Sequence, residues 1–371
     1  MQSTGSELTA AEKRERLALY RQVRARATEW LLDQTNPDGS IGDTSEGYFF
    51  YRGPWTFSLV GETEAASRLC GWIRKHMLQP DGRIGGPCRK INDAWAYRDS
   101  ALIVGAQMAG QYDLSHGLMP ALLRWQDPAS GAFANDRRED GSKSDDQSIP
   151  YTAGGGFACL ATGNLAAARS VASFLRRIYD AQDELPNRFY YDWSRARQTP
   201  NREFHPEQAF WFVVENRIAR LQRWTVGGIA AGFLCRLYLA DPDPEYLALA
   251  RLYQDFSMAA TDGQFNYDPV CKSGWGSSLL YLVTGDPRYE AWTYRMGDWF
   301  VRQQHRDGYW PPTDGPSTRG RLIHNALEFT MHVDTLISGL SGGGTFLSPS
   351  SAQRRATIHG DDHPRQEARL W

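Results

Sequence analysis

The residues best suited to chemistry in this sequence share a regular spacing. His324, Glu328 and His332 follow one another at intervals of four residues, which places them broadly on one face of a helix. An imidazole and a carboxylate on a shared face can transfer protons as general acid and base. Two imidazoles and one carboxylate are also ligand types for a first-row metal, although each side chain sits one helical turn from the next. We therefore expect His324 and Glu328 to be catalytic and assign no metal ligands.

Two further carboxylates and a set of aromatic and polar residues stand where apolar segments begin. Asp93 and Asp146 each precede such a segment, so each is either a helix N-cap or an acid in a pocket. We expect both to be catalytic, because paired carboxylates suit glycoside chemistry. The expected substrate-binding residues, each close to the start of an apolar segment, are Trp55, Trp95, Tyr151, Arg223, Trp224, Lys272, Trp275 and Asn325.

These candidates depend on a repeat that is visible in the turns. Each copy has a Trp or Gln, then an Asp-Gly-type turn, then an apolar or aromatic residue, and glycine supplies the positive φ that such a turn needs. The turn glycines are Gly39, Gly82, Gly131, Gly263 and Gly308, with Asn187 in a degenerate copy. The spacing of the copies fits two helices and two loops.

Two kinds of helical segment alternate along the chain. One kind is amphipathic, and the other is apolar on all sides and rich in small residues, which indicates a helix buried on every face. The amphipathic segments are expected near 10–34, 62–79, 113–126, 164–180, 243–257 and 287–304. The buried helices are expected to start near Pro54, Asp93, Ile149, Arg223, Lys272 and Ile323.

This alternation predicts an all-α fold, an (α/α)6 toroid of six inner and six outer helices. An open solenoid is the alternative, but its terminal repeats should be more polar than these. We expect one domain over residues 1–340, an Arg-rich insertion at 181–222 lying over one face, and a flexible tail at 341–371. In such a toroid the N-terminal ends of the inner helices converge on a central cavity, and their dipoles make that cavity electropositive.

Composition narrows the functional class. The chain has 371 residues, a net charge of −2, 13 Trp, 17 Tyr and 16 Phe, which argues against a nucleic-acid partner. No apolar run is long enough for a membrane span, the N-terminus is polar, and five widely spaced cysteines form no C-x-x-C pair. We expect a cytoplasmic protein with a small-molecule substrate, and the oligomeric state stays open. Phosphate-loop and dinucleotide motifs are absent, so no nucleotide cofactor is expected, whereas Mg²⁺ stays an open candidate.

The repeat of Trp or Gln, Asp-Gly and an aromatic residue resembles the QW-type element of the terpenoid cyclase and protein prenyltransferase toroid superfamily. The resemblance covers about residues 25–340, and its most specific piece is residues 273–281 followed by 284–286. It implies ionisation and cyclisation of a prenyl diphosphate among aromatic walls, as in fungal sesquiterpene cyclases of the humulene-synthase kind. The sequence departs from the superfamily in two ways, because it has neither a D-D-x-x-D run nor a D-x-D-D motif, and Asp145-Asp146 is followed by Gln147. Neither a metal-dependent nor an acid-initiated mechanism can therefore be assigned by motif.

The same toroid also resembles carbohydrate-active families, namely unsaturated glucuronyl hydrolases and sugar 2-epimerases. Their pockets combine Trp platforms with Asp, Glu or His acid–base residues, which this sequence also provides. A non-catalytic scaffold with a packed cavity is a third interpretation. The cyclase is the first expectation, because the pocket candidates are richer in aromatic residues than in carboxylates.

Overall fold

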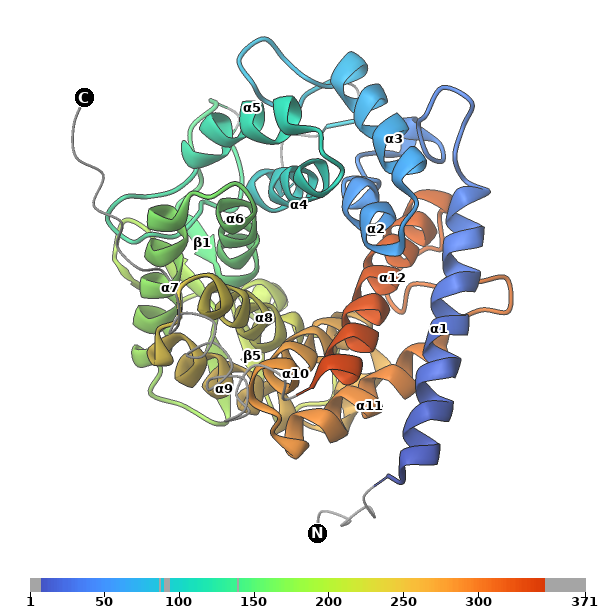
Figure 1. Ribbon diagram of the computed structural model, residues 1–371. Coiled ribbons are helices and arrows are strands. Elements are labelled where there is room, and N and C mark those ends of the chain that lie inside the picture. The colour runs from blue at the N-terminus through green and yellow to red at the C-terminus, as the bar shows by residue number, and fades with distance from the viewer. Residues whose placement is uncertain (1–7, 87, 90–93, 139, 344–371) are drawn as a thin grey trace, which may run out of the picture.

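The computed structural model describes residues 8–86, 88–89, 94–138 and 140–343 and shows a closed ring of helices (Figure 1). Each inner helix packs against the next around the ring, and α12 packs against α2. This closure confirms the predicted all-α toroid and excludes the open solenoid. Within the described residues the inner helices are α2 (Gly53–Val60), α4 (Trp95–Met108), α6 (Ile149–Ala161), α8 (Thr225–Ala240), α10 (Cys271–Thr284) and α12 (Arg319–Gly342).

The outer helices alternate with the inner ones along the chain and surround them (Figure 1). The longest, α1, packs against both α11 and α12, so the start of the ring covers its end. The outer helices in the described part of the chain are α1 (Ala10–Leu32), α3 (Thr63–His76), α5 (Tyr112–Leu123), α7 (Leu165–Asp180), α9 (Pro244–Met258) and α11 (Pro287–Gln303).

The predicted helix starts agree with the structure to within a few residues. The largest difference is at α12, which begins at Arg319 rather than near Ile323 because the Thr318 hydroxyl accepts a bond from the Arg321 amide at 3.3 Å. Asp93, predicted to open the second inner helix, lies outside the described residues, and α4 begins at Trp95.

Small residues bring the inner helices into backbone contact. A Cβ added at Gly105 of α4 would lie 2.3 Å from the Trp55 amide nitrogen of α2. One added at Gly228 of α8 would lie 2.0 Å from the Lys272 carbonyl oxygen of α10. Only glycine fits at these two contacts, and the abundance of glycine in the inner helices is explained by this close packing.

The repeated turns connect each outer helix to the next repeat. Gly131 has φ +82° and Gly308 has φ +105°, and a Cβ on either would lie within 2.4 Å of a carbonyl oxygen of an outer helix, Ser170 or Arg26. Gly263 differs, because it belongs to the 3-10 helix η3 (Asp262–Asn266) and has no positive φ. The predicted copy at that position is therefore a helical connection and not a turn of the repeated type.

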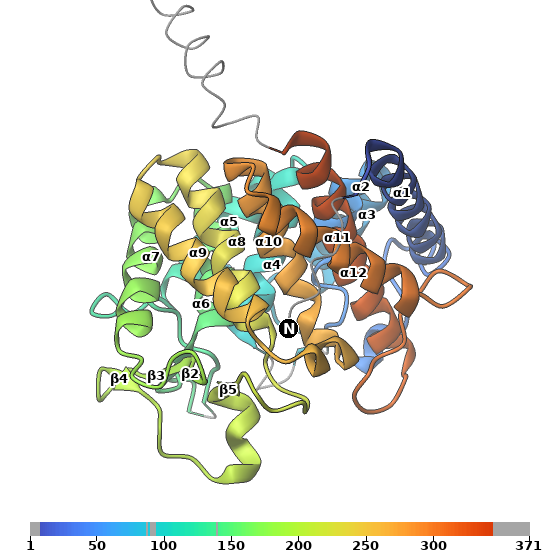
Figure 2. The same ribbon diagram turned by 90° about the horizontal axis from the view of Figure 1, so that it is seen from below.

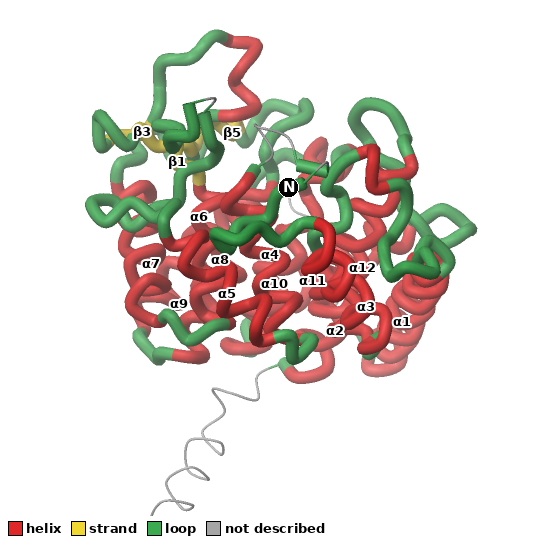
Figure 3. The backbone as a smooth tube through the Cα atoms, turned by 90° about the horizontal axis from the view of Figure 1, so that it is seen from above, coloured by secondary structure: helices red, strands yellow, loops and turns green. Residues whose placement is uncertain are grey.

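Short strands lie together at one end of the ring (Figures 2 and 3). Most belong to the segment between α7 and α8, and β1, just before α6, pairs with β3. One sheet has the order β1-β3-β4 and the other pairs β2 with β5. These elements are β1 (Asp146–Ser148), β2 (Arg188–Tyr190), β3 (Asp192–Ser194), β4 (Thr199–Pro200) and β5 (Val213–Glu215), with the 3-10 helix η2 (Pro206–Trp211).

Two further 3-10 helices, η1 (Thr44–Glu46) and η4 (Asp268–Val270), lie in the connections that precede α2 and α10. Of the predicted tail, residues 344–371 lie outside the described part of the chain. Among the described helices, none combines the length and the apolar character that crossing a bilayer requires.

Candidate active site

A cavity of about 840 Å³ opens at the end of the ring where the inner helices begin. Every inner helix contributes a residue from its N-terminal part or its cap, so the positive ends of the helix dipoles are directed at this space. One such lining residue from each inner helix, taken in chain order, is Arg52, Tyr97, Tyr151, Thr225, Lys272 and Arg321.

Two cations share one carboxylate on the wall of this cavity. Arg52 Nη2 lies 3.1 Å from Glu328 Oε1, and Lys272 Nζ donates to the same oxygen. The three side chains are each less than a tenth exposed. We call Arg52, Lys272 and Glu328 the floor triad; two positive charges and one negative charge leave it with a net charge of +1.

Electrostatic attraction keeps the floor triad ionised. Burial alone would raise the pKa of Glu328, but Arg52 and Lys272 hold that pKa well below its usual value. Burial alone would lower the pKa of Lys272, and Glu328 raises it overall. Glu328 is therefore a permanent counter-ion, and it does not donate a proton at neutral pH.

His324 lies beside the triad and lines the cavity. Its Nε2 is 3.5 Å from Glu328 Oε2, its side chain is 26% exposed, and its buried Nδ1 has no hydrogen-bond partner. Burial, together with the charge of Arg52, lowers the pKa of His324 to about 3. The imidazole is therefore unprotonated at neutral pH.

His332 does not reach the cavity. Its side chain is fully buried, with Nε2 3.5 Å from Glu328 Oε1, and burial lowers its pKa to about 4. The neighbouring Asp334 points elsewhere and pairs with Arg24 of α1. The regular spacing of the two histidines thus places both beside Glu328, where each contacts a different carboxylate oxygen. Of the two, only His324 lines the cavity and can contact a ligand.

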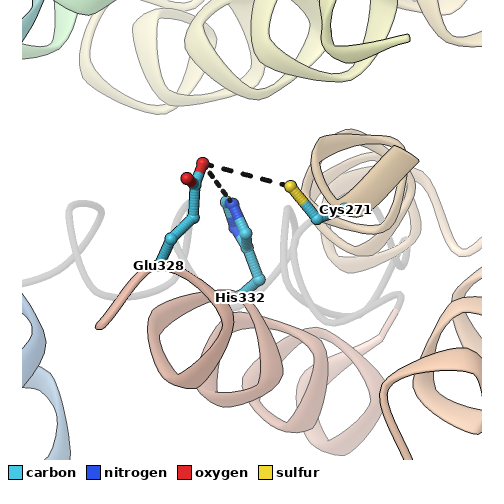
Figure 4. A group of neighbouring side chains, drawn as sticks. All are labelled: Cys271, Glu328 and His332. Atoms are coloured by element: carbon cyan, nitrogen blue, oxygen red, sulfur yellow. Dashed lines mark hydrogen bonds and ion pairs between the residues drawn. The ribbon is translucent and has the colours of Figure 1, made fainter. Parts of the chain in front are cut away.

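Cys271, Glu328 and His332 form the one group of three potential metal ligands within the described residues, with ligand atoms within 4.8 Å of one another (Figure 4). Burial raises the pKa of the Cys271 thiol, which keeps it protonated. The Glu328 oxygen of this group already contacts Arg52 and Lys272. A thiol, an imidazole and a carboxylate shared with two cations do not suit Mg²⁺, which prefers oxygen ligands.

A pair of carboxyl groups forms another wall of the cavity. Asn201 Nδ2 lies 2.5 Å from Asp192 Oδ1 and 3.4 Å from Asp146 Oδ1, and Asn135 donates to Asp192 Oδ2 at 3.1 Å. Burial, followed by the charge of Asp146, raises the pKa of Asp192 well above its usual value. Burial and the charge of Asp145 also raise the pKa of Asp146. Asp192, whose buried carboxyl has the strongly raised pKa, is therefore a candidate proton donor, and Asp146 lies beside it.

The same cavity has an amide–carboxyl pair formed by Asn325 of α12 and Asp268, the first residue of η4. Asn325 Nδ2 donates to Asp268 Oδ2 at 3.0 Å, and the Thr313 amide donates to the same oxygen at 3.0 Å. Burial raises the pKa of Asp268. Hydrogen-bonding groups thus line three sides of the cavity, in addition to the hydroxyls of Tyr97 and Tyr151.

The structure brings most of the predicted polar site residues together. The predicted residues that line the cavity are Asp146, Tyr151, Arg223, Lys272, His324, Asn325 and Glu328. Sequence reasoning missed other lining residues: Tyr51, Arg52, Tyr97, Asp192 and Asp268. The only signal for Arg52 was its place directly before the helix start at Gly53-Pro54.

The four predicted tryptophans do not line this cavity. Trp55 and Trp275 lie at the ring axis with Phe157, which stacks on Trp275 with ring centroids 4.6 Å apart. They surround a void of only about 10 Å³. The other two pack within the wall of the ring: Trp95 stacks on Trp125, and Trp224 Nε1 donates to the Arg220 carbonyl at 3.3 Å.

No protein-family model matches this sequence, and no curated protein matches it. Solved structures do match its fold. A D-mannose isomerase superimposes with a TM-score of 0.63 at 14% identity, over 85% of this chain and 97% of the isomerase. The type II terpene cyclase MstE from Scytonema, in complex with geranylgeranyl dihydroxybenzoate, gives 0.56 at 15% identity, over 88% and 99% of the two chains.

A family 76 α-mannanase from Bacteroides thetaiotaomicron is a third neighbour, with a TM-score of 0.57 at 11% identity, over 85% of this chain and 95% of the mannanase. At these identities the likeness establishes the fold alone. All three neighbours are enzymes on an α/α toroid, and their chemistries differ. Nothing among them supports the narrower resemblance to fungal humulene-synthase-type cyclases.

Proposed function

We propose that this protein is an enzyme that binds a carbohydrate and transfers a proton at a carbon next to its carbonyl group, in isomerisation or epimerisation. The observation that carries this proposal is the neutral imidazole of His324 beside a floor triad with a net positive charge. Deprotonation next to a carbonyl needs both a base and stabilisation of a developing oxyanion. His324 is suited to the first task, and Arg52 and Lys272 are suited to the second.

The proposed reaction needs no external oxidant or reductant. His324 removes the proton from the carbon next to the carbonyl, and the electron pair of the broken C–H bond forms a carbon–carbon double bond. The carbonyl oxygen takes up the negative charge near Arg52 and Lys272. For isomerisation, the hydroxyl proton of the deprotonated carbon passes to the former carbonyl oxygen, and the proton held by His324 adds to the former carbonyl carbon, which leaves a new carbonyl group on the neighbouring carbon. For epimerisation, a proton from water adds to the other face of the deprotonated carbon, the original carbonyl group re-forms, and His324 releases its proton to water. Hydroxyl groups of the sugar have Asn325, Asp268, Tyr97 and Tyr151 as hydrogen-bonding partners.

Acid-initiated terpene cyclisation is the second candidate. Two observations favour it: the fold likeness to MstE and the buried carboxyl of Asp192, whose raised pKa suits proton donation to an alkene. Against it, the surroundings of Asp192 are polar, with Asp146, Asn135 and Asn201 in contact. The aromatic cluster of Trp55, Phe157 and Trp275 leaves no space for a hydrocarbon. We therefore place sugar chemistry first.

One experiment separates these reactions. The purified protein is incubated in D₂O with D-mannose, D-glucose or D-fructose, and NMR follows deuterium incorporation at the carbons next to the carbonyl. We expect incorporation by the wild type and by His205→Gln, a control at an exposed imidazole, and none by His324→Gln. Parallel incubations with α-mannan and with geranylgeranyl dihydroxybenzoate report glycoside hydrolysis and cyclisation. Activity in either of these, without deuterium exchange on any sugar, would overturn the proposal.

The proposed chemistry uses side chains alone. We expect EDTA to change the exchange rate by less than about twofold, because the Cys271–Glu328–His332 group does not suit Mg²⁺. Loss of activity with EDTA and its recovery with added Mg²⁺ would show that a metal is needed.

A further inference from the structure

Arg223 holds an unusual position on the cavity wall. It lies between β5 and α8 and lines the cavity. Its guanidinium carbon lies 4.6 Å from the ring centroid of Phe210 and 4.4 Å from that of Trp211, both in η2. The Tyr191 hydroxyl lies close enough for Arg223 to lower the pKa of that tyrosine, which burial raises overall. The guanidinium therefore sits among aromatic rings.

No carboxylate pairs with Arg223. Among the described residues, none has a carboxylate oxygen within 4.0 Å of its guanidinium, and its Nε is buried without a hydrogen-bond partner. Other arginines of the segment between α7 and α8 are paired: Arg188 with Glu215, Arg202 with Asp183 and Arg220 with Glu215. A cation that faces a cavity without a counter-ion is suited to take one from a ligand.

The rest of the cavity adds to this positive character. The floor triad carries a net charge of +1, and the inner helices direct their N-terminal ends to the cavity. Trp211 is 52% exposed and lines the same space as Arg223. An exposed indole beside a guanidinium offers a flat surface for a sugar ring next to a site for an anion.

We propose that Arg223 and Trp211 form a subsite for a negatively charged group on the sugar, a carboxylate or a phosphate. This inference rests on the proposed carbohydrate function and specifies its substrate class. Arg223 binds the oxyanion through its guanidinium, while the neutral part of the sugar extends toward His324 and the floor triad. In this assignment Arg223 is a specificity-determining residue and takes no part in proton transfer.

Isothermal titration calorimetry tests the subsite without any need for turnover. The probes are D-glucose, D-glucuronate and D-glucose 6-phosphate, and the proteins are the wild type, Arg223→Gln, Arg223→Lys and Arg217→Gln. Arg217 is an exposed arginine of the same segment and serves as the matched control. We expect at least one anionic probe to bind the wild type about tenfold tighter than D-glucose, since charge-assisted hydrogen bonds are strong. The anionic probe that binds tighter identifies the group as carboxylate or phosphate.

Arg223→Gln should remove this preference and leave the affinity for D-glucose unchanged, Arg223→Lys should restore part of it, and Arg217→Gln should resemble the wild type. Equal affinity of the wild type for all three probes, or no binding of any, would overturn the subsite. So would an equal loss for neutral and anionic probes in Arg223→Gln. If the wild type prefers an anionic probe and Arg223→Gln loses that preference, but no sugar exchanges deuterium, the proposed reaction is refuted and the subsite stands.

Discussion

Arg52 and Glu328 form a buried ion pair, 3.1 Å from nitrogen to oxygen, although 276 residues separate them in the sequence. Arg52 caps the first inner helix and Glu328 lies in the last, so the pair bridges the point where the ring closes. Lys272 joins it from α10. The closing contact of the fold and the floor of the cavity are therefore the same group of atoms.

Removal of the shared carboxylate should destabilise the protein strongly. Glu328→Gln leaves Arg52 and Lys272 buried without a counter-ion, and we expect the free energy of unfolding to fall by about 3–5 kcal/mol. Urea unfolding at pH 7 measures this. The pKa of Glu328 is lowered in the folded state, so its stabilising contribution is present above the unfolded pKa of about 4.5 and is lost as the pH falls toward the folded value. An unfolding free energy equal to that of the wild type would show that the triad contributes nothing to stability.

His324→Gln should abolish activity while the protein stays folded. Loss of a general base costs about 10²–10⁴-fold in rate, and a cavity-lining side chain that is 26% exposed can be replaced at small cost in stability. Because the pKa of His324 is about 3, the wild-type rate should not fall between pH 8 and pH 5 through protonation of this residue. Steady-state rates across that range check the profile; a decline centred near pH 6.5 would contradict the assignment.

The raised pKa of Asp192 predicts a particular pH dependence of stability. A carboxyl whose pKa is raised on folding stabilises the folded state fully below the unfolded pKa of about 3.8, and this contribution is lost as the pH rises through the folded value. Asp192→Asn retains a neutral side chain at every pH. We therefore expect the variant to gain stability relative to the wild type between pH 5 and pH 8, as measured by urea unfolding. A constant difference between the two proteins over this range would refute the raised pKa.

A matched pair of glycine substitutions tests the packing of the ring. Gly228→Ala would place a Cβ 2.0 Å from the Lys272 carbonyl oxygen, and we expect a loss of about 3 kcal/mol or more through overpacking. Gly71, inside the outer helix α3, has open space where its Cβ would be. Gly71→Ala should therefore stabilise the protein by about 0.5–1 kcal/mol. Thermal unfolding measures both, and similar effects of the two substitutions would disprove the backbone contact between α8 and α10.

The ring could be predicted from the sequence because its signals are local. The apolar segments that become α6 and α10 are rich in small residues on every side, and the Asp-Gly-type turns repeat with a regular period. Trp299 and Trp310 illustrate the structural role of many aromatic residues. Both are buried and donate their indole N–H to backbone carbonyls. The local sequence pattern and the packing of the whole fold agree here, so the periodicity is sufficient to predict the ring of helices.

The site was less predictable, because a helix period does not give the rotation of a helix about its own axis. Trp275 and Lys272 are both near the start of α10, yet Lys272 lines the cavity and Trp275 packs at the ring axis. Asp192 is positioned by the pairing of β3 with β1, and no periodic pattern in the sequence predicts that pairing. Nothing in the sequence around Arg52 indicates that it is buried, because its ion-pair partner Glu328 is distant in the sequence. Contacts of this kind arise only from tertiary structure.

The closure of the ring by α12 also brings together residues that are synthesised far apart in time. Synthesis produces Arg52 first, then Lys272, and Glu328 and His324 last. A chain still lacking α12 contains Arg223 but neither His324, the proposed base, nor Glu328, the carboxylate that pairs with Arg52 and Lys272. Contacts between such distant segments form slowly in general, because the chain loses conformational entropy when it closes the long loop between them. Under the proposed function, a chain that stops before α12 would therefore be inactive, because activity would require residues of the last inner helix.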